Sequence, residues 1–292
     1  MSFSIEPDLR PDVPARVLDF LLMTSGFGFE SIKSLGIVLS DHPEQHHLLS
    51  HCRSLVYLSI SRKTTYRPPG NRQVFLKWLQ YVYEILHMRQ DKLCLKSFEL
   101  LHVPIHLDQV GSLRLIEALD VSQLRSLTML KCEGSFDLLS KLSGTGALAL
   151  TKLALSDHGN DDKNQTRPAI QKILTSFTGL RDLWLNFLFL PDDNLDFECI
   201  SHHKATLKSL YLGYDYMDME QEPSASAPQD LKAILDVASK CSHLEQLAIT
   251  LAFDGQLNDI PPVRMTDEEM DYGDLIVSNI VPSLTHFVVW IT

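Results

Sequence analysis

One phrase recurs along this 292-residue chain and constrains its fold more than any other feature. It consists of an apolar residue, two variable residues, a second apolar residue, one variable residue and a third apolar residue. The phrase occurs nine times, at 32–37, 55–60, 95–100, 124–129, 150–155, 180–185, 207–212, 244–249 and 284–289. Alternate side chains of a strand point to opposite faces, so the last two apolar residues of each copy should face one way. Because no single copy can bury that face alone, neighbouring copies must stack as a parallel sheet.

The segments between the phrases predict helices, because most of them carry apolar residues at i, i+3 and i+4. We expect helices at 13–23, 44–51, 72–90, 112–119, 136–142, 168–177, 197–204, 229–240 and 267–280. A helix is wider than a strand, so a stack with one helix per copy on the outside must curve. The predicted fold is therefore α/β, an irregular leucine-rich-repeat horseshoe solenoid. Its parallel strands would line the concave face and its helices the convex face.

The copies begin 23 to 40 residues apart, whereas regular leucine-rich repeats span about 20–29 residues, so several copies carry insertions. The phrase continues across each insertion, which predicts a single leucine-rich-repeat domain over residues 1–292. In this reading, residues 1–30 form an N-terminal cap helix region and about nine repeats follow from residue 32. Residues 158–164 are expected to form a polar loop. The chain stops on or just after its last phrase, so a further piece or a covering partner is expected there, since solenoids usually end in a polar cap.

Two helix starts carry local signals. Ser135 precedes Phe136 and Asp137, so we expect it just before the helix. Pro168 follows Arg167 and is expected in a first turn, where the missing N–H of proline is tolerated.

Composition and charge exclude several classes of protein. Apolar residues make up 45% of the chain and charged residues 22%, which is typical of a folded protein. The net charge of −11 predicts no nucleic-acid partner, because phosphate binding needs clustered Lys and Arg. Neither a secretion signal nor an 18-residue apolar stretch is evident, so no membrane association is expected. The five cysteines are widely spaced, which favours reduced thiols and a cytoplasmic or nuclear location.

The negative charge is concentrated in the last third of the chain. From residue 205 onward there are 14 Asp and Glu against 4 Lys and Arg. This segment is either a solvated acidic flank or an electrostatic surface for a basic partner. The aspartates of the loops after the strands could gather along one rim, or could simply be solvated: Asp157, Asp161, Asp162, Asp192, Asp193, Asp215, Asp218 and Asp254.

With its nine irregular copies of helix plus LxxLxL strand, the chain resembles the leucine-rich-repeat regions of fungal F-box-like proteins. The resemblance covers about residues 32–292 and implies that the repeats recruit a substrate for a ubiquitin ligase. In that family an F-box, with an LPxE-like start and short helices, docks on a Skp-type adaptor. Residues 11–22 offer one short amphipathic helix and no F-box is evident, which weakens the expectation of a Skp-type adaptor as partner.

The expected partner is another protein, bound on the concave face. Positions between the inward leucines should point onto this face, and aromatic residues at such positions are enriched at binding hot spots. Trp184 and Tyr211 share one strand position in adjacent repeats, so they should be neighbours. The candidate partner-binding residues are Tyr57, Glu99, Lys152, Asp182, Trp184, Tyr211 and Trp290. The alternative is that long loops fold over the face and bury its aromatic residues.

We expect no enzymatic activity, cofactor or metal site. The densest group of metal-ligand residues is His46, His47, His51 and Cys52. His47 and His51 could share a helix face, but no HExxH pattern or distant ligand pair accompanies them, so a solvated helix is favoured. No GxSxG or nucleotide-binding loop is present. A protein-recognition scaffold is therefore predicted, and the alternative is a structural or orphan repeat protein, possibly truncated, with no ligase role.

Overall fold

A computed structural model describes residues 2–4, 31–39, 52–62, 92–103, 109–132, 134–156, 163–187, 197–214, 231–251 and 283–291. The strands of these segments form one ten-stranded parallel sheet in which the spatial order is the chain order, from β1 to β10. They are β1 (Ser2–Ser4), β2 (Ser34–Leu39), β3 (Tyr57–Arg62), β4 (Ser97–Leu101), β5 (Ser126–Leu130), β6 (Lys152–Ser156), β7 (Asp182–Phe187), β8 (Ser209–Tyr214), β9 (Gln246–Leu251) and β10 (His286–Ile291). The expected α/β architecture with a single parallel sheet is therefore confirmed.

The recurring phrase determines both the burial pattern and the register of the strands. In β4, Phe98 and Leu100 are buried, while the residues on either side of them are partly exposed. The same two phrase positions align across the sheet, so Phe98 lies beside Leu127 and Leu100 beside Met129. The first apolar residue of the phrase is also buried in seven successive copies, in Leu55, Leu95, Leu124, Leu150, Leu180, Leu207 and Leu244.

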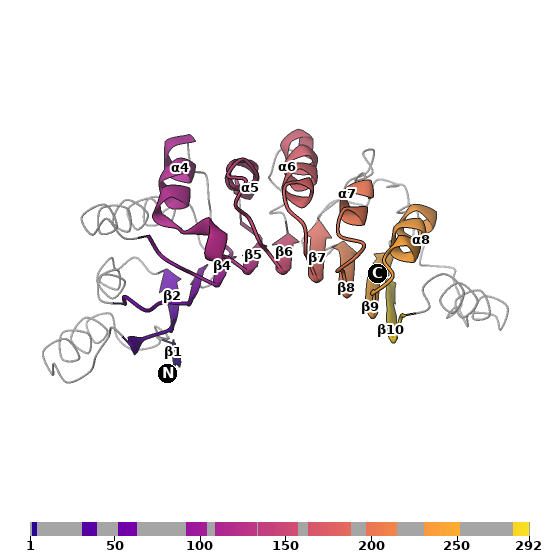
Figure 1. Ribbon diagram of the computed structural model, residues 1–292, viewed down its shortest axis with the longest axis horizontal. Helices are drawn as coiled ribbons and strands as arrows, with labels where there is room; N and C mark the ends of the chain where they lie inside the picture. Colours follow the sequence, from indigo (N-terminus) through magenta and orange to yellow (C-terminus); the bar gives the residue numbers. More distant parts are fainter. Residues whose placement is uncertain are drawn as a thin grey trace, which may run out of the picture.

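The helices all lie on one side of the sheet, on the outside of an arc (Figure 1). They are α4 (Gln109–Ala118), α5 (Ser135–Ser143), α6 (Lys163–Thr175), α7 (Glu198–Ser201) and α8 (Leu231–Lys240), with the short 3-10 helix η3 (Val121–Gln123) before β5. The strands line the inside of the arc, so the described helices cover one face of the sheet and leave the other face, here called the open face, uncovered. The expected helices at 13–23, 44–51, 72–90 and 267–280 lie outside the described residues. In the part of the chain that the structure describes, no helix combines the length and apolarity needed to cross a membrane.

A single apolar core runs between the sheet and the helices. One continuous cluster of buried residues extends from Leu35 in β2 to Ile249 in β9. Ile170, Ile173 and Leu174 of α6 belong to it and are fully buried, as is Ile234 of α8. Each fully buried Leu or Ile stabilises the fold by about 1.5–3 kcal/mol relative to an exposed one. The stacking of the copies therefore supplies the stability that an isolated copy lacks.

The N-terminal region differs from the sequence-based prediction. Residues 1–30 were expected to contain only a cap helix, but Ser2–Ser4 forms β1, which pairs with β2 in parallel. The phrase is absent from this segment, so nothing in the leucine pattern signals a strand there. The free edge of β2 provides backbone donors and acceptors for whichever segment lies beside it.

Helix starts also differ from the prediction. Ser135 is the first residue of α5, and the preceding Gly134 adopts the left-handed conformation with φ 76°. Glycine has no Cβ and tolerates this conformation, so it makes the turn that the serine was expected to make. Helix α6 begins at Lys163 and contains Pro168 in its interior, so part of the expected 158–164 loop is helical. Pro168 removes one backbone N–H, which does not prevent a turn of helix from forming before it.

Helix α7 is shorter than the predicted 197–204 helix. It ends at Ser201, and the chain continues in turns in which the N–H of His203 donates to the Ile200 carbonyl and that of Leu207 to the His203 carbonyl.

We predict that Leu153→Ala lowers the free energy of unfolding by about 2–5 kcal/mol, because Leu153 is 1% exposed and its truncation leaves a cavity. Urea unfolding followed by circular dichroism measures the loss. Leu113→Ala on α4 is the matched control, since Leu113 is 45% exposed and its truncation should cost less than about 1 kcal/mol. Equal midpoints for the two variants would contradict the described core.

Candidate functional site

The parallel register arranges the open face of the sheet in rows that run across the strands. The central row, as we call it, contains the residue between the two buried phrase positions of each strand. Its members are Gly36, Ser59, Glu99, Thr128, Ala154, Trp184, Tyr211, Ala248 and Val288. From β6 to β10 the central row is apolar, apart from the Tyr211 hydroxyl, and Val288 is 41% exposed. Side chains of this row face the inside of the arc and not the helices.

An aromatic pair occupies the middle of this apolar stretch. The rings of Trp184 and Tyr211 are stacked, with centroids 5.0 Å apart and planes inclined by 8°. Both residues are partly exposed. Ala154 and Ala248 are their neighbours on either side in the central row. Because alanine side chains are short, these neighbours leave the two rings partly exposed.

Gly213 provides the space in which the Tyr211 ring lies. A Cβ atom at Gly213 would lie 2.5 Å from Cε1 and the hydroxyl oxygen of Tyr211, so no side chain fits there while the ring keeps this position. On β7, Gly213 is in register with Asn186. The side-chain oxygen Oδ1 of Asn186 is buried and makes no hydrogen bond to any described residue. The sequence-based site did not include Gly213, although a glycine two residues after an aromatic residue in a strand is a signal of such close approach.

Two charged residues lie next to the aromatic pair. Lys152 and Asp182 are in register on β6 and β7, and Lys152 Nζ lies 3.3 Å from Asp182 Oδ2. The Lys152 side chain is 66% exposed and that of Asp182 40%. An ion pair this exposed adds at most about 1 kcal/mol to stability. Its groups remain accessible to a partner, and Asp182 is only two residues before Trp184 on the same strand.

Tyr57 and Glu99 form a separate pair on β3 and β4. The Tyr57 hydroxyl donates a hydrogen bond to Oε2 of Glu99. Partial burial and then this hydrogen bond to the carboxylate raise the pKa of Tyr57 above its usual value. The pair lies three strands from Trp184, so it is not part of the aromatic cluster. Trp290 belongs to β10, where its backbone is in register with Thr250, and its side chain lies outside the described part of the structure.

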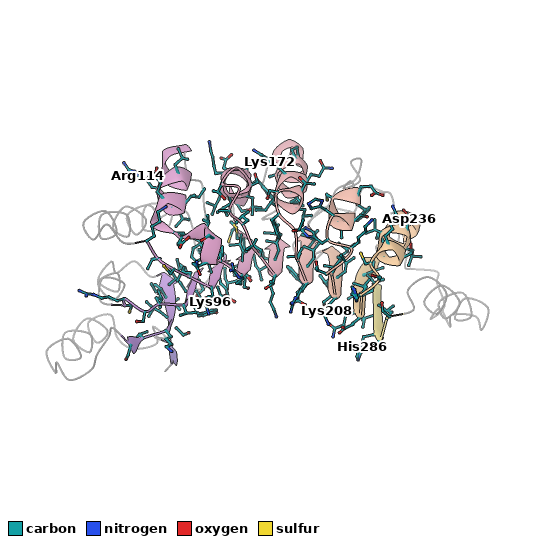
Figure 2. All side chains as sticks on the ribbon, viewed as in Figure 1. Lys96, Arg114, Lys172, Lys208, Asp236 and His286 are labelled. Carbon is teal, nitrogen blue, oxygen red and sulfur yellow. The ribbon has the colours of Figure 1, made fainter. Side chains whose placement is uncertain are left out.

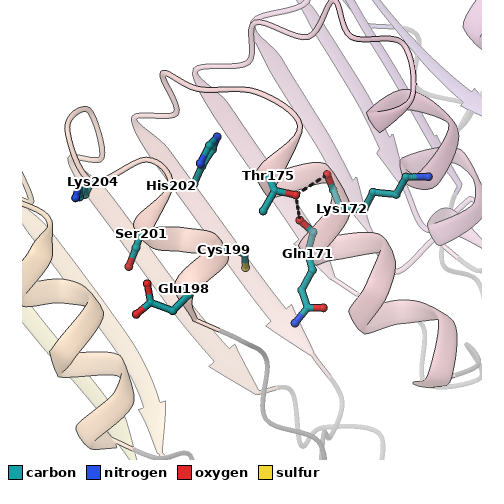
Figure 3. A pocket seen from close by; sticks show the side chains of 8 residues that line it. All are labelled: Gln171, Lys172, Thr175, Glu198, Cys199, Ser201, His202 and Lys204. Atoms are coloured by element: carbon teal, nitrogen blue, oxygen red, sulfur yellow. Dashed lines mark hydrogen bonds between the residues drawn. The ribbon is translucent and has the colours of Figure 1, made fainter.

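A depression lies on the helix side, between α6 and α7 (Figure 3). It is open, has a volume of about 500 Å³, and is lined by Gln171, Lys172, Thr175, Glu198, Cys199, Ser201, His202 and Lys204. Lys172 Nζ donates to the Ser140 carbonyl, and Glu198 is paired with Lys240 of α8. The labelled side chains spread over the depression and do not converge on one point. We therefore place the candidate site on the open face of the sheet.

A buried histidine, His203, stands in the chain between His202 and Lys204, which line this depression. His203 is 1% exposed, and the backbone of Leu174 lies close to its ring. Its ring centroid lies 5.0 Å from that of Phe177, and the edge of the His202 ring approaches it. Burial, followed by the charge of His202, lowers the pKa of His203 to about 4. His203 is therefore a neutral core residue at physiological pH.

The metal and thiol candidates have no catalytic arrangement in the described segments. These segments contain no group of three or more His, Cys, Asp and Glu placed to hold a metal ion. Cys52 is buried, while the three histidines predicted near it lie outside the described residues, as do the eight loop aspartates. Burial raises the pKa of Cys241 to about 11, so its thiol is protonated at neutral pH and is a poor nucleophile.

The chain matches no family model, no curated protein and no solved structure at a significant level.

We predict that Gly213→Ala displaces the Tyr211 ring and breaks its stack with Trp184, because the new methyl group would occupy the position of that ring. Near-ultraviolet circular dichroism should lose the signal of the coupled rings, and the same loss is expected in Tyr211→Leu. Gly36→Ala is the control, since no atom lies within 4 Å of the Cβ position there. An unchanged spectrum for Gly213→Ala would show that the rings are not packed as described.

The stability of the fold should depend on pH through His203. The unfolded chain takes up a proton on His203 near pH 6.5, whereas the folded chain does so only near pH 4. The fold therefore keeps its full stability above about pH 6.5, where the ring is neutral in both states. The free energy of unfolding decreases as the pH falls from there towards 4. His203→Phe should reduce the stability lost between about pH 7.5 and pH 5 by roughly 2 kcal/mol.

Urea titrations at both pH values measure this difference. Leu113→Ala, which removes no titratable group and lies at an exposed position, is the control and should keep the pH dependence of the wild type. An equal pH dependence in His203→Phe and the wild type would mean that His203 is not buried as a neutral ring.

Proposed function

We propose that this chain is an irregular leucine-rich-repeat solenoid that acts as a non-enzymatic scaffold for protein recognition. Its binding site would be the open, concave face of the sheet, centred on Trp184 and Tyr211. The observation that supports this most strongly is a stacked aromatic pair, partly exposed and 5.0 Å between centroids, on a face that the described helices leave uncovered.

The residues on the open face have the properties of a protein-binding surface. Tryptophan and tyrosine are the residues most enriched at interface hot spots, because they bury a large area while losing little conformational entropy. Stacking fixes both rings before a partner arrives, which reduces the entropic cost of binding. An apolar row that extends over β6 to β10 offers the dry centre of an interface. The exposed Lys152 and Asp182 provide polar groups beside it, as expected for an interface rim.

Solenoids use such concave surfaces to bind extended partners. Small-molecule enzymes, in contrast, enclose most of the substrate in a cavity. The open face argues for a partner of protein size. A narrower form of the proposal is that this partner is a substrate recruited to a ubiquitin ligase. That form rests on the resemblance to F-box-like repeat regions, and co-purification of a Skp-type adaptor and a cullin with the full chain would support it.

Selection from a displayed library of random peptides tests the proposal directly. We expect the wild-type chain to enrich peptides that Trp184→Ala/Tyr211→Ala does not bind, with affinity lower by at least tenfold, because truncation of two hot-spot residues costs more than about 1.4 kcal/mol. Fluorescence anisotropy with the enriched peptides measures the affinities.

Lys172→Ala/Gln171→Ala, on the helix side, is the control variant and should bind as tightly as the wild type. Each variant must retain the far-ultraviolet circular dichroism spectrum of the wild type. If every enriched peptide binds the folded aromatic variant with unchanged affinity, the proposed site is wrong.

A further inference from the structure

A row of cations lies immediately before the strands, at the edge of the open face where each strand begins. It consists of Lys33, Lys96, Arg125, Arg181 and Lys208, all of them exposed. We call these residues the basic row. Each occupies the first variable position of its phrase. The corresponding positions in the remaining copies are Val56, Thr151, Glu245 and Thr285.

Backbone hydrogen bonds hold this row in line. The N–H of Arg125 donates to the Lys96 carbonyl, and that of Thr151 donates to the Arg125 carbonyl. In the same way, the N–H of Arg181 donates to the Thr151 carbonyl and the N–H of Lys208 donates to the Arg181 carbonyl, both at 2.8 Å. Neighbours along the row are therefore separated by one strand spacing, about 4.8 Å. Lys96 and Lys208 both lie on the strand side of the arc, opposite Arg114 and Lys172 (Figure 2).

Among the described residues, most members of the row have no acidic partner. Lys96 has no ion pair or side-chain hydrogen bond with any described residue, and the same holds for Arg181. The guanidinium of Arg125 donates only to the carbonyls of Ser122 and Leu124, which carry no net charge. Lys208 is the member with an acidic partner, Glu245 at 2.5 Å.

Like charges on adjacent strands repel each other and destabilise the pairing. Arg125 lies beside Lys96, and Lys208 lies beside Arg181. The next row on the same edge contains Lys152, which is 66% exposed and paired with Asp182. These cations lie together on a chain whose net charge is −11. A bound anion would relieve this repulsion. The chain as a whole is acidic, but at this edge the anion would meet cations.

We propose that the partner contributes an extended acidic segment that crosses β4 to β8 along the basic row, with its carboxylates beside Lys96, Arg125, Arg181 and Lys208. An apolar residue of that segment packs on Trp184 and Tyr211, so the inference rests on the proposed function of the aromatic pair. From Lys96 to Lys208 the row spans four strand spacings, or about 19 Å, which an extended segment of about six residues covers. Arg181 precedes Trp184 by three residues on the same strand, a distance of about 10 Å.

A protein segment fits this surface better than a nucleic acid does. Nucleic-acid binding draws its affinity from many phosphate contacts, whereas this row offers four cations over its central span and Lys208 is already paired with Glu245. The net charge of −11 repels a polyanion that extends beyond the row. The adjacent apolar row from Ala154 to Val288 also requires apolar side chains in the ligand, which an acidic peptide can supply between its carboxylates.

The test uses the full chain and a displayed random library of peptides about 12 residues long, which covers the 19 Å span with flanking residues. Wild-type protein should enrich peptides that contain more Asp and Glu than the unselected library, each with at least one aromatic or large aliphatic residue. Lys96→Gln/Arg125→Gln/Arg181→Gln should bind these peptides about tenfold more weakly, since each exposed ion pair contributes up to about 1 kcal/mol. The affinity for the wild type should fall as salt is raised from about 50 to 500 mM.

Lys172→Gln/Arg114→Gln removes two cations from the helix side and should leave the affinity unchanged.

If the enriched peptides depend on Trp184 and Tyr211 but show no acidic bias, the inference fails and the proposed function stands. Acidic peptides that bind the row variant as tightly as the wild type also overturn it. If acidic peptides depend on the row and not on the aromatic pair, the proposed role of that pair fails, and the apolar contact in this proposal fails with it. Tight binding of a single-stranded oligonucleotide that is lost in the row variant would assign the row to nucleic acid and overturn the acidic-peptide proposal.

Discussion

The structure depends on the burial of apolar residues between neighbouring copies of one phrase. Each copy contributes a strand of five or six residues from β2 onward, which cannot form a core alone. Stacking the copies creates a continuous core from Leu35 to Ile249, and the parallel hydrogen bonds then fix one copy against the next. Helices cover one face of the sheet only, because the phrase places its buried side chains on that face. The opposite face is left open as a consequence of the same pattern.

The register that builds the core also creates the site. Leu183 aligns with Leu210, and therefore Trp184 aligns with Tyr211. A slip of one residue would move both rings to the helix side. The cations of the basic row are aligned by the same hydrogen bonds, one residue before each strand begins. The proposed extended, amphipathic ligand would meet stacked rings at the centre of this face and cations along one edge.

The leucine pattern was sufficient to predict strands β2 to β10, the buried phrase positions and the proximity of Trp184, Tyr211, Lys152 and Asp182. It could not predict β1, because Ser2–Ser4 is held by the edge of β2 and by no apolar repeat of its own. The helix starts predicted from Pro168 and Ser135 were wrong. A local signal competes with the conformation of neighbouring residues, such as the left-handed Gly134. Ring stacking and the space at Gly213 depend on side-chain rotamers, which spacing does not specify. The basic row became apparent once the hydrogen bonds aligned positions that are 26 to 56 residues apart, as for Arg125 with Thr151 and with Arg181.

Cross-linking of engineered cysteines measures the register most directly. Thr128 and Ala154 are Cα partners on β5 and β6, about 4.8 Å apart and within the range of a disulfide. In a background in which the exposed Cys94 is replaced by serine, mild oxidation of Thr128→Cys/Ala154→Cys should give a disulfide that is detected by mass spectrometry after proteolysis. Thr128→Cys/Lys152→Cys, displaced by two residues, should remain reduced. The reverse pattern, or no cross-link in either folded variant, would contradict the register on which the core, the aromatic pair and the basic row all depend.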